Sequence, residues 1–124
     1  MLSINYKDPR PIYEQVRDAL RQLILSGAIA PGEKLPSVRE LAASLAINPN
    51  TIQRSYRELE ALGLINTVPG KGAFAATDGA AAHRRTHELY QQLSAAVQEL
   101  KLLGVQRSDV ISAAEEAYGK EEDA

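Results

Sequence analysis

Four polar side chains recur at helical spacing near the middle of the chain: Asn50, Gln53, Arg54 and Arg57. Residues three and four apart are neighbours on a helix surface, so in a helix from about 49 to 62 these four share one face. An arginine can bridge O6 and N7 of guanine, and an asparagine or glutamine can pair with adenine. This face is therefore suited to base edges and phosphates of a nucleic acid, although an ordinary solvated helix face has the same composition.

A second candidate site is the turn Pro69-Gly70-Lys71-Gly72, expected to join short strands at 64–68 and 73–76. Glycines on both sides of Lys71 allow a tight turn and a close approach of the backbone to a phosphate. The Lys71 ammonium would then lie on a nucleic-acid backbone or in a minor groove. No nucleotide-binding fold surrounds this Gly-x-Gly, so the pattern indicates a hairpin tip and not a nucleotide phosphate loop.

A short helix is expected directly before these elements. Ser37 stands three residues before Glu40, the spacing of a capping box in which each side chain bonds the backbone N–H of the other residue. Apolar residues then follow at helical spacing and predict one narrow buried stripe. The members of this stripe are Val38, Leu41, Ala42 and Leu45.

The helix that carries the polar face has its own start and stop signals. Asn48 is a suitable N-cap and Pro49 suits the first helical position, while Gly63 supplies the stop. Its expected buried face consists of Ile52, Tyr56 and Leu59, with Leu62 at the margin. About two residues, Ala46 and Ile47, separate the two helices, so the connection forces a sharp angle. Two capped helices, a tight turn and a basic hairpin predict a winged helix-turn-helix.

The segment from Pro11 to Phe74 resembles the DNA-binding domain of the GntR family of bacterial transcription regulators, and most of all its YtrA subfamily. The motifs that carry the resemblance are Pro11-Ile12-Tyr13, Ile24 with Gly27, Pro31-Gly32, Leu35-Pro36-Ser37, Arg39-Glu40-Leu41-Ala42, Asn50-Thr51, Arg57-Glu58-Leu59-Glu60, Gly63-Leu64-Ile65 and Gly70-Lys71-Gly72.

The resemblance implies which residues meet DNA. Arg39 would contact the DNA backbone and bases, Asn50, Thr51 and Gln53 would lie where the recognition helix meets DNA, and Gly70 with Lys71 where the wing does. Gln53 departs from relatives that carry arginine, and Ala73 stands where threonine is frequent. The complete expected DNA-binding set is Ser37, Arg39, Asn50, Thr51, Gln53, Arg54, Arg57, Gly70 and Lys71.

The N-terminal part is expected to support this motif. A helix from about Pro11 to Ser26, stopped by Gly27, would bury a stripe of Ile12, Val16, Ala19, Leu20 and Leu23. The basic residues Lys7, Arg10, Arg17 and Arg21 are interpreted as solvated charge. The segment 28–36 is interpreted as an ordered connector.

The C-terminal part is expected to be a helical tail after a small-residue hinge at 77–81. In a helix from about 82 to 103, five residues step by four, three, four and three, which is the seam along which helices pack. They are Leu89, Leu93, Ala96, Leu100 and Leu103. After Gly104, Ser108 is expected to cap a second helix with an apolar face of Val110, Ile111, Ala114 and Tyr118.

The expected fold is therefore mainly α with a small β-hairpin: a winged helix-turn-helix domain at 1–77 and a two-helix dimerisation tail at 78–124. The tail helices cannot bury their apolar faces alone. Pairing with a second copy is favoured over folding back on the winged domain, because it gives the two-fold symmetry that a palindromic operator requires. A tail of this size cannot form the large effector domain of many relatives. Any small-molecule site would then lie between subunits or between tail and wing.

The charge of the chain is divided between these parts. The net charge is −2, but residues 1–79 carry nine Lys and Arg against eight Asp and Glu, while residues 80–124 carry five against eight. The acidic balance thus belongs to the tail, and phosphate binding depends on the local surface.

Other function classes find little support in the sequence. The chain has no Cys, no Ser-His-Asp constellation and no paired carboxylates with a pocket signal, so we expect no enzyme, no catalytic residue and no cofactor. His83 and His87 share a helix face and could ligate a metal with Glu88 or Asp78, but exposure near a hinge is the favoured interpretation. No apolar run approaches a membrane span, and a cytoplasmic location is expected.

The sequence therefore predicts a homodimeric, sequence-specific regulator of transcription that binds double-stranded DNA and acts as a repressor. The family resemblance implies control of a transporter operon. The alternative is a winged-helix module that binds protein or RNA through the same surface. The operator, the regulated genes and an effector ligand stay open.

Overall fold

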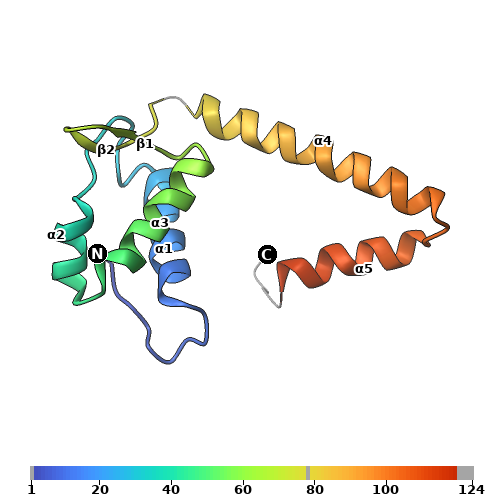
Figure 1. Ribbon diagram of the computed structural model, residues 1–124, viewed down its shortest axis with the longest axis horizontal. Coiled ribbons are helices and arrows are strands. Elements are labelled where there is room, and N and C mark those ends of the chain that lie inside the picture. The colour runs from blue at the N-terminus through green and yellow to red at the C-terminus, as the bar shows by residue number, and fades with distance from the viewer. Residues whose placement is uncertain (1, 78, 120–124) are drawn as a thin grey trace. The chain divides into compact units, whose positions relative to one another are not determined.

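The computed structural model describes residues 2–77 and 79–119. The chain divides into two compact units, Met1–Arg85 and Thr86–Ala124. The first unit holds three helices, a hairpin and the start of a fourth helix, and the second is helical (Figure 1). The elements are α1 (Ile12–Ser26), α2 (Val38–Leu45), α3 (Pro49–Ala61), β1 (Ile65–Val68), β2 (Gly72–Ala75), α4 (Ala80–Leu102) and α5 (Arg107–Tyr118). The winged helix-turn-helix fold and the two C-terminal helices are as expected.

The expected caps of α2 and α3 are confirmed. The Glu40 N–H donates to Ser37 Oγ at 3.0 Å, and the Ser37 N–H donates to Glu40 Oε1 at 2.8 Å, which completes the capping box. The Asn50 N–H donates to Asn48 Oδ1 at 2.8 Å, and Pro49 occupies the first turn of α3. These bonds satisfy N–H groups that have no partner inside the helix.

The turn between α2 and α3 contains an unexpected backbone feature. Ala46 has φ +56°, a left-handed conformation that costs a non-glycine residue on the order of 1–2 kcal/mol. Two backbone bonds offset this cost, because the N–H groups of Ala46 and Ile47 donate to carbonyl groups of α2. Ile47 also packs against the core. The sharp angle at the connection therefore comes from a left-handed alanine.

Helix α3 is the centre of the core. Ile52, Tyr56 and Leu59 are buried as expected, and Leu62 lies at the margin with 36% of its surface exposed. They pack with Val16 and other apolar residues of α1, α2 and the hairpin. Ser55 is fully buried as well, which its type did not predict. Its hydroxyl donates to the Tyr13 carbonyl of α1 at 2.7 Å, so this polar contact fixes α3 to α1.

The hairpin begins and ends one residue from the expected positions. Ile65 pairs with Ala75 and Val68 pairs with Gly72, so Gly72 belongs to β2 and not to the turn. The segment 28–36 is more than a connector. The Leu35 N–H donates to the Ala73 carbonyl and the Ala75 N–H donates to the Glu33 carbonyl, so this segment forms a third strand-like strap along β2.

The tail helices differ from expectation at their ends. Helix α4 begins at Ala80, and α5 begins at Arg107 with Gln106 as its N-cap. The prediction that Ser108 caps α5 is wrong. Gln106 has the extended backbone of a cap residue, and its carbonyl accepts the Asp109 N–H, so Ser108 lies within the first turn.

One consequence of the packing is that the free energy of unfolding depends on pH through the Tyr56 hydroxyl. This hydroxyl donates to the Pro36 carbonyl at 2.7 Å, and burial, aided by the charge of Glu40, raises the pKa of Tyr56 to about 12 from 10.0. A raised folded-state pKa gives stability that is complete below pH 10.0 and is lost as pH rises towards about 12. We expect Tyr56→Phe to flatten this alkaline decline and to cost about 1 kcal/mol near pH 7. Denaturant unfolding at a series of pH values measures both effects, and parallel pH curves for parent and variant would exclude the assignment.

Candidate nucleic-acid interface

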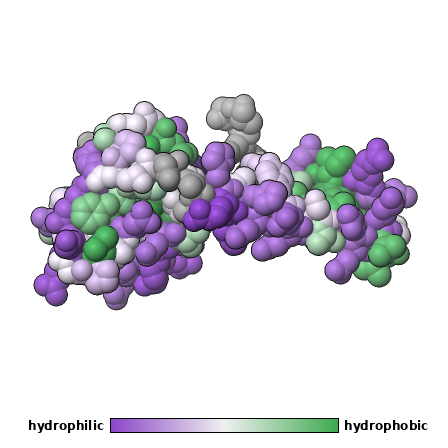
Figure 2. Space-filling model, turned by 90° about the horizontal axis from the view of Figure 1, so that it is seen from above, coloured by the Kyte–Doolittle hydropathy of each residue, from purple (hydrophilic) through white to green (hydrophobic). Residues whose placement is uncertain are grey.

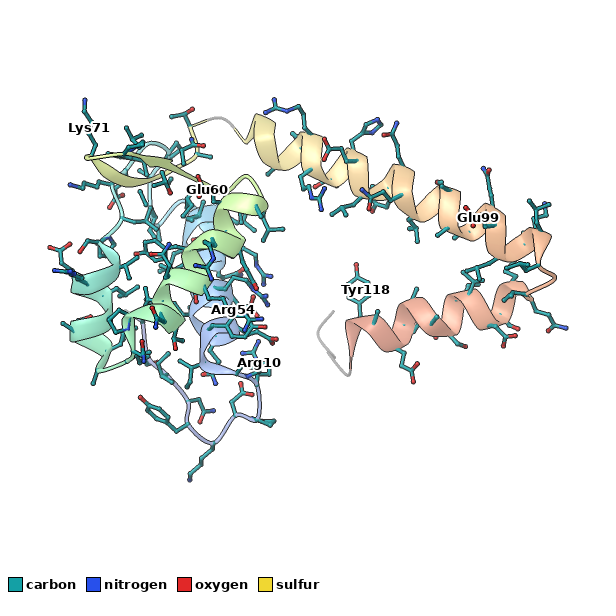
Figure 3. The ribbon with its side chains drawn as sticks, viewed as in Figure 1. Arg10, Arg54, Glu60, Lys71, Glu99 and Tyr118 are labelled. Atoms are coloured by element: carbon teal, nitrogen blue, oxygen red, sulfur yellow. The ribbon has the colours of Figure 1, made fainter. Side chains whose placement is uncertain are left out.

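The expected DNA-binding residues come from three elements of the first unit. Ser37 caps α2 and Arg39 lies in its first turn, the polar residues of α3 lie on and beside its outer face, and Lys71 lies at the hairpin tip. Figure 3 shows the Lys71 side chain pointing away from the tip. Thr51 is partly buried and the other eight are exposed: Ser37, Arg39, Asn50, Gln53, Arg54, Arg57, Gly70 and Lys71.

Five exposed side chains of this set are available for a ligand: Arg39, Asn50, Gln53, Arg57 and Lys71. Within the described part of the chain, no hydrogen bond or ion pair joins any of these side chains to a protein group. Arg39, Arg57 and Lys71 carry a positive charge.

Arg54 is placed differently from its neighbours on α3. Its guanidinium lies over the Tyr13 ring, 3.6 Å from the centroid, and donates to the Tyr13 hydroxyl at 2.9 Å. Its Nε is 3.6 Å from a Glu58 carboxylate oxygen. Arg54 therefore lies on the flank of α3 that faces α1 (Figure 3), where a cation–π contact holds it.

The basic residues of α1 are paired and do not act as free solvated charge. Arg17 contacts Asp18 at 2.9 Å and Glu58 of α3 at 2.7 Å, and the bond to Asp18 raises the pKa of Arg17 although burial opposes it. Arg21 of α1 and Arg10, which lies just before this helix, also pair with Asp18. These pairs, with the Arg54 contact, lie along the α1–α3 seam. The arginines at the α1–α3 seam are thus paired, whereas Arg39, Arg57 and Lys71 have no partner among the described residues.

Lys34 is a further basic residue near the wing that sequence reasoning missed. Its backbone pairs with that of Phe74 in an isolated antiparallel β-bridge. Its side-chain Cε would lie 3.0 Å from a Cβ added at Gly72, where φ is +120°. The Lys34 stem therefore packs across the hairpin where only glycine leaves room. Little in the sequence indicated this pairing, because the short segment between Pro31 and Pro36 does not show the alternating pattern of a strand.

Other kinds of site find no geometric support in the described residues. Across 2–77 and 79–119, no group of three His, Cys, Asp or Glu side chains is arranged to hold a metal ion. Asp78, one of the suggested partners of His83 and His87, lies outside these residues. Of the helices described, none is long and apolar enough to cross a membrane.

Comparisons with known proteins agree with the geometry. Residues 12–75 match the family model described as bacterial regulatory proteins, gntR family. The HTH-type transcriptional repressor YtrA of Bacillus subtilis (strain 168) is 46% identical over 74 residues, which are 60% of this chain and 57% of that repressor. The uncharacterized HTH-type transcriptional regulator YhcF of the same organism is 36% identical over 107 residues, covering 86% of this chain and 88% of YhcF. The matched region is thus little more than half of YtrA but most of YhcF.

Solved structures give the same result. A protein described as a transcriptional antiterminator from Listeria monocytogenes EGD-e is 36% identical, with a TM-score of 0.63 over 95% of this chain and 90% of that chain. AraR(DBD) in complex with operator ORX1 is 30% identical, with a TM-score of 0.56 over 60% of this chain and 96% of that chain. The first likeness includes the tail, and the second is to a DNA-binding domain in complex with an operator.

Proposed function

Because this chain belongs to the GntR family of bacterial regulatory proteins, in its YtrA-like branch, we propose that it represses transcription by binding a palindromic operator as a homodimer. One observation carries the proposal. The carboxylates of Glu40, Glu58 and Glu60 are bonded within the protein. In contrast, Arg39, Arg57 and Lys71 have no partner among the described residues. These cations lie on the helix-turn-helix and the wing, the elements that this fold presents to DNA.

Each residue of the proposed DNA-binding surface has a proposed role. Arg57 and Gln53 on α3 would meet base edges in the major groove, since their side chains are free to form bidentate bonds. Arg39 at the start of α2 would contact the backbone and bases. Lys71 and Gly70 would lie against a phosphate at the wing. Ser37, Asn50 and Thr51 complete the proposed surface, and Arg54 would act mainly by holding α3 on Tyr13.

We assign dimerisation to the tail, as a domain at 78–124 following the winged domain at 1–77. Several of its large apolar side chains are exposed: Leu89, Leu93, Leu102, Leu103, Ile111 and Tyr118. Figure 2 shows apolar surface gathered around the connection between α4 and α5. Exposed apolar surface of this kind marks an interaction site, and the seam on α4 suits a second copy of the same helix.

Repression is proposed because the YtrA relative is a repressor by its description. Control of a transporter operon, and a cytoplasmic location with the chromosome, follow from the family resemblance in the same way. RNA binding is the competing function to test, since one structural neighbour is described as an antiterminator.

Binding to the DNA upstream of the chain's own gene tests the proposal. A gel-shift titration of the full chain should give a saturable complex with a palindromic duplex. A scrambled duplex and an RNA duplex of the same length should bind far more weakly. Preferential binding of the RNA, or equal binding of the scrambled DNA, would contradict the proposed function.

The wing has its own expected effect. Lys71→Ala removes one phosphate interaction per chain, so it should weaken binding to all duplexes similarly. A plot of the logarithm of the binding constant against the logarithm of the salt concentration has a negative slope. Its magnitude should decrease by about 0.9 for each phosphate that is no longer neutralised. Titrations at a series of salt concentrations measure this slope. Lys101→Ala in α4 is the matched control and should leave the slope unchanged. A slope in Lys71→Ala equal to that of the parent would remove Lys71 from the interface.

A further inference from the structure

The first unit contains an apolar groove that the proposed DNA contacts do not use. Its volume is about 830 Å³, and it lies among α1, α2 and the strap at 28–36. Leu20 and Leu23 of α1 form one wall, and Leu41 and Leu45 of α2 form another. This size and lining are those of a small-molecule site: mostly apolar walls with a few polar groups. The groove lies within the winged unit, a place that the sequence did not suggest for a small-molecule site.

The charges along the groove select the kind of molecule. Glu33, Glu40 and Lys34 line it together with the apolar residues, so the lining carries two carboxylates and one ammonium. The Lys34 stem is directed across Gly72 towards the wing. Each carboxylate already uses one oxygen in a backbone bond, Glu33 Oε1 with the Ala30 N–H and Glu40 Oε1 with the Ser37 N–H. Among the described residues, the second oxygen of Glu33 is in no hydrogen bond, and Glu40 adds its negative charge to the same lining.

We propose that this groove binds a small amphiphilic cation. The apolar body of the ligand would pack between the leucines of α1 and α2, and its positive centre would lie near Glu33 and Glu40. Burial of apolar surface supplies most of the affinity, and the carboxylates supply the preference for a cation over an anion.

Occupancy of the groove would affect DNA binding, a step that depends on the proposed function. Helix α2 carries Arg39, and its capping box contains Glu40, which also lines the groove. The strap that forms the third wall pairs with β2 of the wing. A ligand that binds two arrangements of these walls unequally shifts the balance between them, and operator DNA must then change the affinity for the cation by the same factor.

The test uses the full chain and two probes of matched shape and opposite charge, tetraphenylphosphonium and tetraphenylborate, without DNA. Calorimetric titration should show saturable binding of one tetraphenylphosphonium per chain and at least several-fold weaker binding of tetraphenylborate. Equal affinities for the two ions, or no saturable binding of the cation, would overturn the proposal. Because no DNA is present, this result is independent of the outcome for operator binding.

Variants that keep the hydrogen bonds identify the groove as the site. The double variant E33Q/E40Q keeps its backbone bonds, since glutamine also serves in a capping box, and should weaken cation binding about three- to tenfold. The matched control E99Q/E115Q removes two exposed carboxylates from α4 and α5 and should bind like the parent. S44F fills the groove from α2 and should abolish binding. Parent-like affinity in both groove variants would place the cation elsewhere and reject the proposal.

Discussion

Removal of residues 86–124 should lower operator affinity by about 10²–10⁴-fold, because two linked half-site interactions become one. The remaining unit keeps the whole apolar core, from Val16 to Ala75, together with the start of α4, where Ala82 packs against that core. We therefore expect residues 1–85 to fold, to sediment as a monomer and to retain weak, salt-dependent binding to a half-site. Analytical ultracentrifugation and gel-shift titration measure these properties.

A full-length variant separates dimerisation from removal of the tail. Leu89 and Leu93 are exposed by 43% and 53%, and they lie on the α4 seam. The double variant Leu89→Glu/Leu93→Glu should dissociate the dimer and lose affinity as the fragment does. The control Gln91→Glu/Gln98→Glu adds the same charge on the opposite side of α4 and should remain dimeric. A stable dimer of residues 1–85, or of the seam variant, would show that the tail is not the dimer interface.

Arg57→Ala and Arg54→Ala should have opposite effects. Arg57 has no partner within the described residues, so its removal should leave the free energy of unfolding unchanged and cost operator binding about 1–3 kcal/mol for each chain. Arg54 lies on Tyr13 and near Glu58, so its removal should lower the free energy of unfolding by about 1 kcal/mol, with a smaller effect on DNA binding. Chemical denaturation and operator titration on both variants provide the comparison.

Tyr13→Phe is the control for this pair. It keeps the aromatic face and removes the hydroxyl that accepts from Arg54, so it should reproduce only part of the stability loss. The assignment fails if Arg54→Ala binds the operator as poorly as Arg57→Ala while folding as stably as the parent. Arg54 would then belong with the DNA-binding residues, as its helix position first indicated.

The helices and their ends could be predicted from the sequence where the signal is local. Ser37 with Glu40, and Asn48 with Pro49, set the starts of α2 and α3 through bonds within one turn. The period of apolar residues in α3 indicated its buried face for the same reason. The prediction for Ser108 was wrong because serine is a favourable cap residue, whereas the helix starts two positions earlier, with Gln106 as its N-cap.

Interactions between distant segments could not be predicted in this way. The bond from Ser55 to the Tyr13 carbonyl, the Arg17 pair with Glu58 and the strap of Lys34 on Phe74 all join residues far apart in the chain. A polar or basic residue type gives no sign of such a partner. For the same reason, the polar face of α3 was predicted as one set, whereas the structure separates Arg54 from Arg57 by their partners.

The central claim is that the unpaired basic residues on α2 and α3 meet DNA, whereas the paired ones on and just before α1 do not. Nuclear magnetic resonance of the arginine Nε–Hε groups measures this directly when an operator duplex is added to the full chain. We predict large changes for Arg39 and Arg57 and little change for Arg10 and Arg17. Changes confined to Arg84 and Arg107 of the tail helices, with Arg39 and Arg57 unaffected, would contradict the account.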